Sequence, residues 1–466
     1  MNRQTPSGFT RFGAKASLAV AIVSTLALPL YAQASSFQLP TTNAAGWGRA
    51  GAGGSLFPDD VTAAYNNPAA MAFFDAPMLQ VTATGIRPSA EFQGQFKDAL
   101  GNPTSGSNPN GFGKLEPFPN IAWAAPVNDR LTLGGAVTVP FGLVSQYNPT
   151  WQGRYFGTKT SLQSIAVSFS AGFKVNDEFS IGAGILGQRT KAQLNSVLDP
   201  MGTADVLAVL GGKPPTYAPQ SGDVQLNVNV KKRFAFGYFG GFEWKPTQQD
   251  SVDLSYHSRV KQTLSGNYKL YGPASSIYLL QVAPILAPQA GLPTLNPNGA
   301  SAGAQLDTPA FASIDWLHKF NDQFSLAATA SWTDWSNFQS LALVSQGQSL
   351  ISLPEKYKDT FAYSIGGDYK LNDQWTLRGG VGYDQTPVGI IARDPRIPDG
   401  SRRIVGVGVG YKATQRISFD LGYQHQFVSD VSVNQVNPLA LGYGSMVGKF
   451  KDHGDIVSLT GTYAFK

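Results

Sequence analysis

The chain contains no cysteine, so disulfide bonds, cysteine-ligated zinc and thiol catalysis are all excluded. Charged residues make up only 14% of its 466 residues, whereas soluble globular proteins have roughly 25%. After the N-terminal region, no uninterrupted apolar run reaches the roughly 18 residues that a transmembrane helix needs. The nearest, residues 277–293, is interrupted by three prolines. Insertion into a membrane would therefore require a closed β-barrel, because lipid cannot satisfy the backbone groups of an open sheet.

The first 34 residues resemble a secretory signal peptide. An apolar stretch at 16–30 is followed by small residues at 32–34, and three basic residues precede it: Arg3, Arg11 and Lys15. We expect the mature chain to begin at Ser35. The net charge is +5, and these three basic residues account for most of it, so the mature chain is nearly neutral and a nucleic-acid partner is not expected.

Large apolar residues alternate with small or polar residues along much of the chain. Residues 165–173 place Ile, Val, Phe, Ala and Phe on one face, and residues 405–411 alternate Val or Tyr with Gly. The same period of two recurs in residues 375–383 and 417–423. One apolar and one small or polar face is typical of transmembrane β-strands. The high contents of glycine (51 residues) and aromatic residues (12%) suit a wall that faces lipid.

Turn signals between the alternating segments predict the number of strands. We attribute the short turns to residues that tolerate positive φ, and they are Asn128-Asp129, Asn176-Asp177, Asn321-Asp322, Asn372-Asp373, 245–248 and 412–415. Longer connections are expected at 94–117, 147–160, 194–222, 268–307, 338–356, 387–401 and 430–452. This pattern predicts an all-β fold, a 14-stranded antiparallel transmembrane β-barrel over 77–466 with its short turns in the periplasm. Tryptophans near these turns are expected to form an interfacial girdle: Trp123, Trp244, Trp316 and Trp375.

Two regions stand out at the ends of the predicted barrel. Residues 35–76 do not alternate, and their glycine-rich, weakly charged composition favours a hatch, or plug, folded into the lumen over a free linker. The last strand alternates up to Tyr463 and Phe465, as the assembly signals of outer-membrane barrels do, although Lys466 follows the final aromatic residue.

Several motifs in order resemble the long-chain fatty acid and aromatic hydrocarbon transporter family (FadL and TodX type) of Gram-negative outer membranes. They include 46–50 (GWGRA), 66–69 (NNPA), 331–338 (SWTDWSNF), 383–388 (YDQTPV) and 420–423 (DLGY). The resemblance covers almost the whole mature chain. It implies a 14-stranded barrel in the outer membrane, and a hatch gated at Asn67, Pro68 and Ala69. It also implies passive uptake of long-chain fatty acids or of aromatic or aliphatic hydrocarbons.

A break is expected in the third strand, because Pro140 cannot donate a ladder hydrogen bond and Gly142 has no side chain to pack. One interpretation is a simple bulge near the rim. The family resemblance implies another, in which Val139, Pro140, Phe141 and Gly142 form a kink that opens a lateral exit through the barrel wall. Some relatives have a small polar residue before the kink that helps to hold a carboxylate. Val139 stands near that place here and favours uncharged hydrocarbons.

Two apolar loop segments are candidates for a surface groove that first contacts ligand, or for a lid formed by two packed helices. The candidate ligand contacts are Val206, Leu207, Val209, Leu210, Tyr278, Leu279, Leu280, Ile285 and Leu286, together with Phe37 and Leu39 from the hatch. Arg154, Lys356 and Lys358 are possible anchors for a carboxylate, although cations at a loop rim also bind lipopolysaccharide.

Other functions compete with hydrophobic uptake. An outer-membrane enzyme acting on acyl chains is weakly supported, since the four histidines lack a Ser/His/acid context and the Gly46–Gly51 segment lacks a βαβ unit. A general diffusion porin for small polar nutrients would need a charge-lined pore, and a structural barrel or adhesin is a further alternative. We expect no catalytic residue, metal or cofactor. The expected partners are a hydrophobic substrate, outer-membrane lipid and lipopolysaccharide, detergent in vitro and the barrel assembly machinery.

Overall fold

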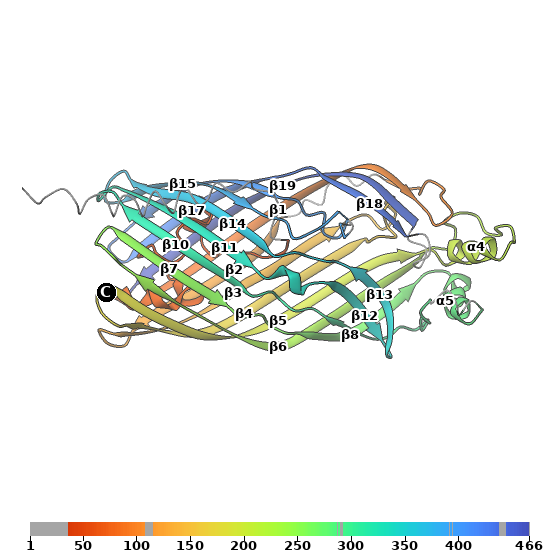
Figure 1. The fold of residues 1–466 in the computed structure, drawn as a ribbon, viewed down its shortest axis with the longest axis horizontal. Helices are drawn as coiled ribbons and strands as arrows, with labels where there is room; N and C mark the ends of the chain where they lie inside the picture. Colours follow the sequence, from red (N-terminus) through yellow and green to blue (C-terminus); the bar gives the residue numbers. More distant parts are fainter. Residues whose placement is uncertain are drawn as a thin grey trace, which may run out of the picture. The chain divides into compact units, whose positions relative to one another are not determined.

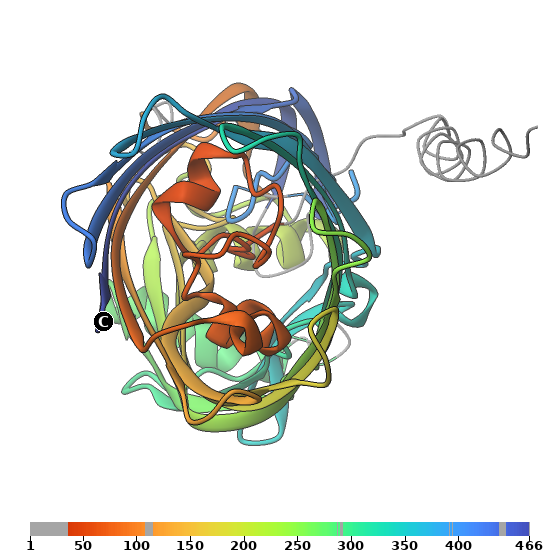
Figure 2. The same cartoon turned by 90° about the vertical axis from the view of Figure 1, so that its left-hand side faces the viewer.

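The structure is a computed structural model that describes residues 36–107, 115–286, 288, 292–390, 392–393, 395–437 and 444–465. The predicted signal peptide and Lys466 lie outside these residues. Within them the fold is a closed antiparallel barrel, seen from the side in Figure 1 and along its axis in Figure 2. Among the described residues, no helix is both long and apolar enough to cross a bilayer.

The strands are numbered in chain order, and the ring closes where β1 pairs with β19 along its whole length. Their bounds are β1 Met78–Lys97, β2 Glu116–Pro126, β3 Leu131–Gln146, β4 Lys159–Lys174, β5 Phe179–Leu198, β6 Val224–Trp244, β7 Asp250–His257, β8 Thr263–Tyr271, β9 Ala300–Gln305, β10 Phe311–Lys319, β11 Phe324–Thr333, β12 Ser340–Ser345, β13 Gln348–Pro354, β14 Thr360–Lys370, β15 Trp375–Asp384, β16 Arg402–Lys412, β17 Ile417–Val428, β18 Val431–Asn437 and β19 Gly444–Ala464.

The barrel wall consists of fourteen spans. The number of labelled strands is larger because several spans are interrupted, and each of these carries two strand labels. Both β7 and β8 pair with β6, and both β17 and β18 pair with β19. In the same way β9 and β10, β11 and β12, and β13 and β14 follow each other along single spans. The predicted 14-stranded antiparallel barrel is confirmed.

The side chains alternate between the outer and inner faces as the sequence predicts. Ile185 is 65% and Phe236 79% exposed on the outside. On the inside, the hydroxyl groups of Thr82 and Thr460 are 2.8 Å apart, within hydrogen-bond distance. All four tryptophans predicted for the girdle are exposed beside the short turns. A lipid-facing apolar wall thus surrounds a polar interior.

The six short turns are where the sequence predicts them, but the predicted reason for them is wrong. None of their residues has positive φ. Instead, one side-chain oxygen in each turn accepts hydrogen bonds from the backbone N–H groups two and three residues later in the chain. Asn128, Asn176, Asn321 and Asn372 do this, and Thr247 and Thr414 do the same with their hydroxyl groups. This Asx or Ser/Thr turn explains why threonine can replace asparagine there.

Two of the long connections expected from the sequence are largely strand. Residues 338–356 contain the β12–β13 hairpin, whose two-residue turn is Gln346 (φ +49°) and Gly347 (φ +79°). A two-residue hairpin turn of this kind needs positive φ at both positions. Residues 430–452 contain β18 and the first part of β19, which pair from Val431↔Phe450. These strands lengthen the barrel beyond the expected membrane band, where strand pairing, and not lipid contact, decides their extent.

The helices lie at two places. In the N-terminal segment, defined here as residues 36–77, are α2 Ala44–Gly48, α3 Ala63–Asn66 and the 3₁₀ helix η1 Pro68–Phe73. Figure 2 shows this segment, coloured red-orange, inside the ring of strands. At the long-loop end are α4 Pro200–Leu210 and α5 Ala274–Leu286, which contact each other (Figure 1). The 3₁₀ helix η3, Trp335–Asn337, joins β11 to β12.

Glycines on the inner wall allow the N-terminal segment to lie close to the strands. A Cβ atom at Gly172 of β4 would collide with the carbonyl oxygen of Pro68, and one at Gly182 of β5 with the amide of Ala69. On the other side, a Cβ at Gly406 of β16 would collide with the carbonyl of Trp47. The small face of the alternating strands is therefore the surface on which this segment packs.

Candidate functional site

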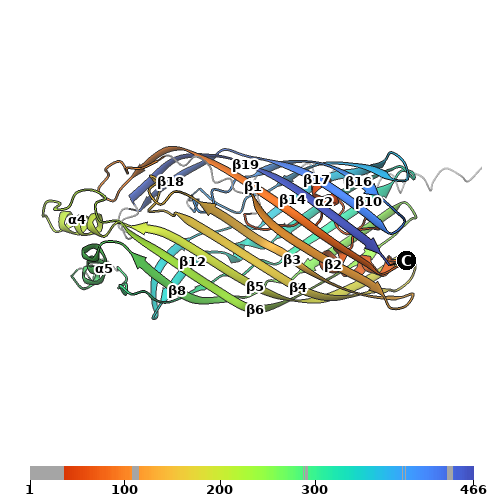
Figure 3. The ribbon, with the colours of Figure 1, turned by 180° about the vertical axis from the view of Figure 1, so that it is seen from behind.

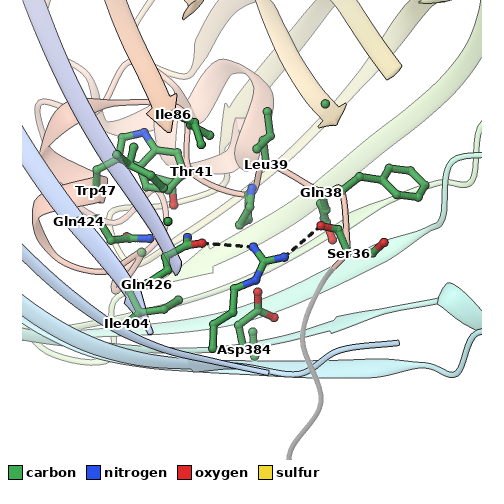
Figure 4. Close-up of a pocket in the computed structure, with 18 of the residues that line it drawn as sticks. Ser36, Gln38, Leu39, Thr41, Trp47, Ile86, Asp384, Ile404, Gln424 and Gln426 are labelled. Carbon is green, nitrogen blue, oxygen red and sulfur yellow. Dashed lines mark hydrogen bonds between the residues drawn. The ribbon is translucent and has the colours of Figure 1, made fainter. Parts of the chain in front are cut away.

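A cavity of about 480 Å³ lies between the start of the N-terminal segment and the inner wall. Its apolar lining includes Phe37, Leu39, Ile86, Phe118, Val139, Leu143, Ile404 and Ile456. Its polar lining includes Ser36, Asp384, Asp399, Arg402, Gln424 and Gln426, several of which are drawn in Figure 4. The cavity therefore offers an apolar surface beside a separate hydrogen-bonding region whose groups largely bond to one another.

Phe37 fills an aromatic cluster beside this cavity. Its ring centroid is 4.7 Å from that of Trp335, 6.0 Å from that of Phe338 and 6.1 Å from that of Phe141, in edge-to-face arrangements. The side chain is 3% exposed. Such pairs add about 0.5–1.5 kcal/mol each to the burial of the ring. Phe37 thus fixes the first described turn of the chain against β3 and η3.

The third strand is irregular at the predicted position. The pairing of β3 with β4 runs to Thr138↔Ala166 and resumes at Phe141↔Ser164, so Val139 and Pro140 oppose one residue of β4. This is a one-residue β-bulge. The N-terminal segment pairs with the bulged strand: the N–H of Leu39 donates to the Pro140 carbonyl (2.9 Å), and the N–H of Gly142 donates to the Phe37 carbonyl (3.0 Å).

The other edge of β3 separates from β2 at the same height. The two strands pair only from Ile121↔Val137 to Pro126↔Thr132. Beyond Val137, within these fully described strands, β4 is the one barrel strand that pairs with β3, and β1 is the one that pairs with β2 residues 116–120. The cavity is lined from both sides of this unpaired stretch, by Phe118 of β2 and by Val139 and Gly142 of β3. Figure 3 shows β1, β2 and β3 side by side. We call this stretch the β2–β3 seam.

One polar side chain bridges β2 and β3 at the end of the seam where their backbone pairing stops. The side-chain oxygen of Asn120 in β2 accepts from the Thr138 hydroxyl (2.7 Å) and from the Val139 N–H (3.3 Å). Its side-chain nitrogen donates to the carbonyl of Thr42 (3.1 Å) in the N-terminal segment. Because Asn120 is 4% exposed, these bonds satisfy a buried amide and connect the seam to the segment.

The predicted gating motif lies against β4, β5 and β6. The side-chain nitrogen of Asn67 donates to the Phe242 carbonyl of β6 (3.2 Å), and its oxygen accepts from the N–H of Ala69, which caps η1. The Ser180 hydroxyl of β5 donates to the Ala69 carbonyl (2.9 Å). Asn67 also lines the cavity, and Pro68 and Ala69 are buried.

A buried ion-pair network holds α2 to the wall. Arg49, 2% exposed, donates to Asp368 of β14 (3.1 Å), and Arg378 of β15 bridges Asp368 and Asp420. The Arg49 guanidinium also lies 3.4 Å from the ring centroid of Phe57. Removing one partner of a buried pair typically costs about 3–5 kcal/mol. This end of the segment is therefore more firmly held than residues 36–42.

The structure brings only some of the predicted site residues to the cavity. Phe37, Leu39, Val139 and Gly142 line it, whereas Phe141 packs in the aromatic cluster and Pro140 offers its carbonyl to Leu39. The other predicted ligand contacts are in α4 and α5. Among these, Val209, Leu210, Tyr278 and Ile285 are exposed, Leu280 is buried, Val206, Leu207 and Leu279 are half-buried, and the side chain of Leu286 lies outside the described residues.

The three predicted carboxylate anchors are elsewhere. Arg154 is 4% exposed and donates to Asp223 (2.6 Å), to the Ser105 carbonyl and to the Tyr155 hydroxyl, so its donors serve the loop structure. Lys356 and Lys358 are exposed on the chain between β13 and β14. None of the three is among the cavity-lining residues.

A basic residue that the sequence analysis missed lies at the cavity instead. Arg402, at the start of β16, donates to the Ser36 carbonyl (3.1 Å), to Asp399 (2.8 Å) and to Gln426 (3.3 Å). Figure 4 shows Ser36 and Gln426 converging on this guanidinium. The Ser36 N–H in turn donates to Asp399 (3.2 Å). No local sequence signal marks Arg402, because its partners are up to 366 residues away along the chain.

Comparison with known proteins agrees with this architecture. Residues 25–465 match the profile of a family described as outer membrane protein transport protein (OMPP1/FadL/TodX). A long-chain fatty acid transport protein of Salmonella typhi is 26% identical over 90% of this chain and 92% of its own length. The crystal structure of a Pseudomonas aeruginosa FadL homologue is 40% identical, with a TM-score of 0.85 over 93% of this chain and all of that one. The toluene transporter TbuX of Ralstonia pickettii, 17% identical, shares the fold over 92% of this chain and 99% of that one (TM-score 0.63).

Proposed function

Because the chain belongs to the family of outer membrane transport proteins described as OMPP1/FadL/TodX, we propose that it takes up hydrophobic compounds through the β2–β3 seam. It is a β-barrel protein of the Gram-negative outer membrane. The relatives named above include a long-chain fatty acid transport protein and a toluene transporter, which suggests substrates of that class. The observation that carries the proposal is a partly apolar cavity lined from both edges of an unpaired stretch of wall.

In the proposed path, a ligand first contacts the exposed apolar residues of α4 and α5, including Leu210 and Ile285. It then enters the cavity and displaces Phe37. Because residues 37–39 pair with the bulge of β3, their displacement frees the backbone of Pro140 and Gly142 and loosens one edge of the seam. The ligand leaves sideways into lipid, with movement of the segment around Asn67, Pro68 and Ala69. The removal of apolar surface from water, at about 25 cal/mol per Å², favours the overall transfer into lipid without energy input.

The lining supports uncharged substrates over carboxylates. The side chain of Val139 cannot donate a hydrogen bond at the bulge, and Arg402 already donates to Asp399. A fatty acid would have to compete with that buried ion pair, whereas an alkane or a monoaromatic compound would not. We therefore propose aromatic or aliphatic hydrocarbons as the preferred ligands, with long-chain fatty acids as weaker ones.

Hydrophobic uptake is better supported than the alternatives. The N-terminal segment occupies the lumen beside the cavity, which argues against a wide pore for polar nutrients. The named relatives are transport proteins, which argues against an acyl-chain enzyme.

We further propose that the barrel assembly machinery recognises β19, whose last outward residues are Tyr463 and, just beyond it, Phe465.

The test fills the seam. A Cβ atom at Gly142 would lie 3.3 Å from the tip of the Leu39 side chain and 4.0 Å from the nearest backbone atom, and Gly142 lines the cavity, so Gly142→Trp is chosen to place a bulky side chain at the seam. We expect at least a tenfold loss of uptake of radiolabelled toluene and oleate by cells that lack their own transporters. The control is Val167→Trp, on the lipid-facing side of β4. Both variants should keep the heat-modifiable gel shift of a folded barrel. Normal uptake by a folded Gly142→Trp protein would exclude the seam as the exit.

A further inference from the structure

Four basic side chains gather on the outer face of two neighbouring strands. Arg189 and Lys191 of β5 and Lys231 and Arg233 of β6 are all exposed. Their inward-pointing neighbours are buried: Gln188 is 2% and Thr190 0% exposed. We call these four residues the β5–β6 basic patch. They project away from the lumen and from the cavity described above.

The register of the two strands places like charges together. Lys191 is directly opposite Lys231, and Arg189 faces the bulge formed by Arg233 and Phe234. Like charges directly opposite each other on one face of a sheet are destabilising. No ion pair within the described residues involves any of the four. The patch therefore carries uncompensated positive charge at a place where an anion would stabilise it.

The patch lies directly above the apolar belt, on the side of the long loops. Going from the patch toward the short turns, the next outward residues are Phe234, Phe236 (79% exposed) and Ile185 (65% exposed). The rings of Phe234 and Phe236 both approach the outer side of Gly187. This change from apolar to basic side chains marks the boundary between lipid chains and lipid headgroups. Long loops of outer-membrane barrels are extracellular, so the headgroups are those of the outer leaflet.

The wall formed by β1 and β19 carries basic residues too, but there acidic residues lie opposite some of them. On the outer face of β1 and β19, Lys451 is directly opposite Glu91, and Asp455 accepts from His425 (2.8 Å). Other exposed basic residues on that side are Arg87, Arg403 and Lys449. Acidic residues therefore lie opposite some of the basic residues on this wall, whereas Lys191 and Lys231 of the patch lie opposite each other, so the patch is the stronger candidate for an external anion.

We propose that the β5–β6 basic patch binds the phosphate groups of the lipid A part of lipopolysaccharide. Lipid A carries phosphates on a sugar backbone and several acyl chains, so it matches a cluster of cations above exposed aromatic rings. Arg189 and Arg233 form bidentate hydrogen bonds to phosphate oxygens, and Lys191 and Lys231 supply further charge. The acyl chains lie on Phe236 and Ile185. The site is separate from the cavity and from the substrate path.

The test compares two matched quadruple variants of the full barrel, purified free of lipopolysaccharide in neutral detergent. The patch variant is Arg189→Gln, Lys191→Gln, Lys231→Gln and Arg233→Gln. The control variant, on the outer face of β1, β16 and β19, is Arg87→Gln, Arg403→Gln, Lys449→Gln and Lys451→Gln. Both lose four positive charges on the outer surface. Binding of bisphosphorylated lipid A is measured by native mass spectrometry and by surface plasmon resonance, and folding by heat-modifiability.

We expect the patch variant to bind lipid A at least tenfold more weakly, and the control variant to bind it within twofold of the unchanged protein. Dephosphorylated lipid A should bind all three proteins equally and weakly. Equal losses in both variants, or none in a folded patch variant, would overturn the proposal. Phosphatidylglycerol vesicles that bind the patch as tightly as lipid A would replace it with a general site for anionic lipid.

Discussion

Two β-bulges of the same size have different consequences in this barrel. In β3, Val139 and Pro140 oppose one residue of β4, and in β6, Arg233 and Phe234 oppose one residue of β5. Above its bulge, β6 pairs again with a strand on its other side, from Lys231↔Ser265 to Gln225↔Tyr271. Above its own bulge, β3 has no such pairing with β2.

The difference shows that a bulge alone does not open a wall. At β6 the extra residue turns basic and aromatic side chains outward, and the strands on both sides remain joined above it. At β3 the extra residue is proline, and the backbone groups around it are taken by residues 37–39 of the N-terminal segment. The unpaired edge of β3 therefore combines a bulge with a bonding partner inside the barrel, and the bulge of β6 has no such backbone partner among the described residues.

Deleting Pro140 should have the largest effect, because it removes the bulge and brings Val139 opposite Ile165 with the remaining pairs unchanged. We expect uptake of labelled toluene to fall by at least tenfold. The matched control deletes Arg233, which removes the bulge of β6 in the same way and should leave uptake within twofold. The measurement is initial uptake rate by whole cells, normalised to folded protein. A folded Pro140 deletion that transports normally would end the distinction between the two bulges.

Phe37→Ala should have an intermediate effect, because it removes the ring that holds residues 37–39 against β3. The loss of a buried phenylalanine costs about 3–5 kcal/mol. Hydrogen exchange at the Leu39 and Gly142 amides should therefore accelerate by roughly a hundredfold or more. Phe450→Ala, which removes an equally buried ring in a different cluster, should leave these two amides unchanged. Equal protection in both variants would mean that Phe37 does not hold the bulge.

The smallest effect is expected from pH. It concerns the loop that joins β5 to β6, on the long-loop side of the β6 bulge. Burial raises the pKa of Asp199 to about 6, and the nearby Asp223 and Asp98 carboxylates add to this, while its bond from the Gly202 N–H opposes it. Since the folded state favours the protonated form, the local stability of α4 is full below about pH 4 and falls as the pH rises through 6.

Amide exchange in α4, corrected for the intrinsic effect of pH, should therefore speed up by about tenfold between pH 4 and pH 7. In Asp199→Asn, which stays uncharged, this dependence should disappear. The β3 amides near Gly142 should show no matching change, because no part of this cluster touches them. A pH response that persists in Asp199→Asn would assign it to another group.

Many features of the fold follow from local patterns. Alternation and turn signals predict the number of spans, because a strand with lipid on one side must place apolar residues on every second position. The turn positions are correct even though the reason is not, since an asparagine or threonine oxygen can cap a turn without positive φ. The hairpin at Gln346 was missed because its strands lie beyond the lipid, where apolar alternation is no longer required.

The irregularity of β3 follows from the sequence because single residues there carry their own constraint. Pro140 and Gly142 mark the bulge because one lacks a donor and the other a side chain. Arg402 was missed, since nothing around it in the sequence reveals that Ser36 and Gln426 lie beside it. The role of Arg154 as a possible carboxylate anchor stays a prediction, and the sequence does not show its bonds to Asp223 and Ser105, which are made across a loop.

The sequence by itself determined an amphipathic barrel wall, its turns and the weak point in the third strand, because each of these depends on a few neighbouring residues. Only the tertiary structure decided that β2 and β3 separate at that weak point, that residues 37–39 bond to β3 there from inside, and that Lys191 lies opposite Lys231 on the outside. Those facts depend on the register between strands and on contacts between distant residues, and neither is encoded in any short stretch of the chain.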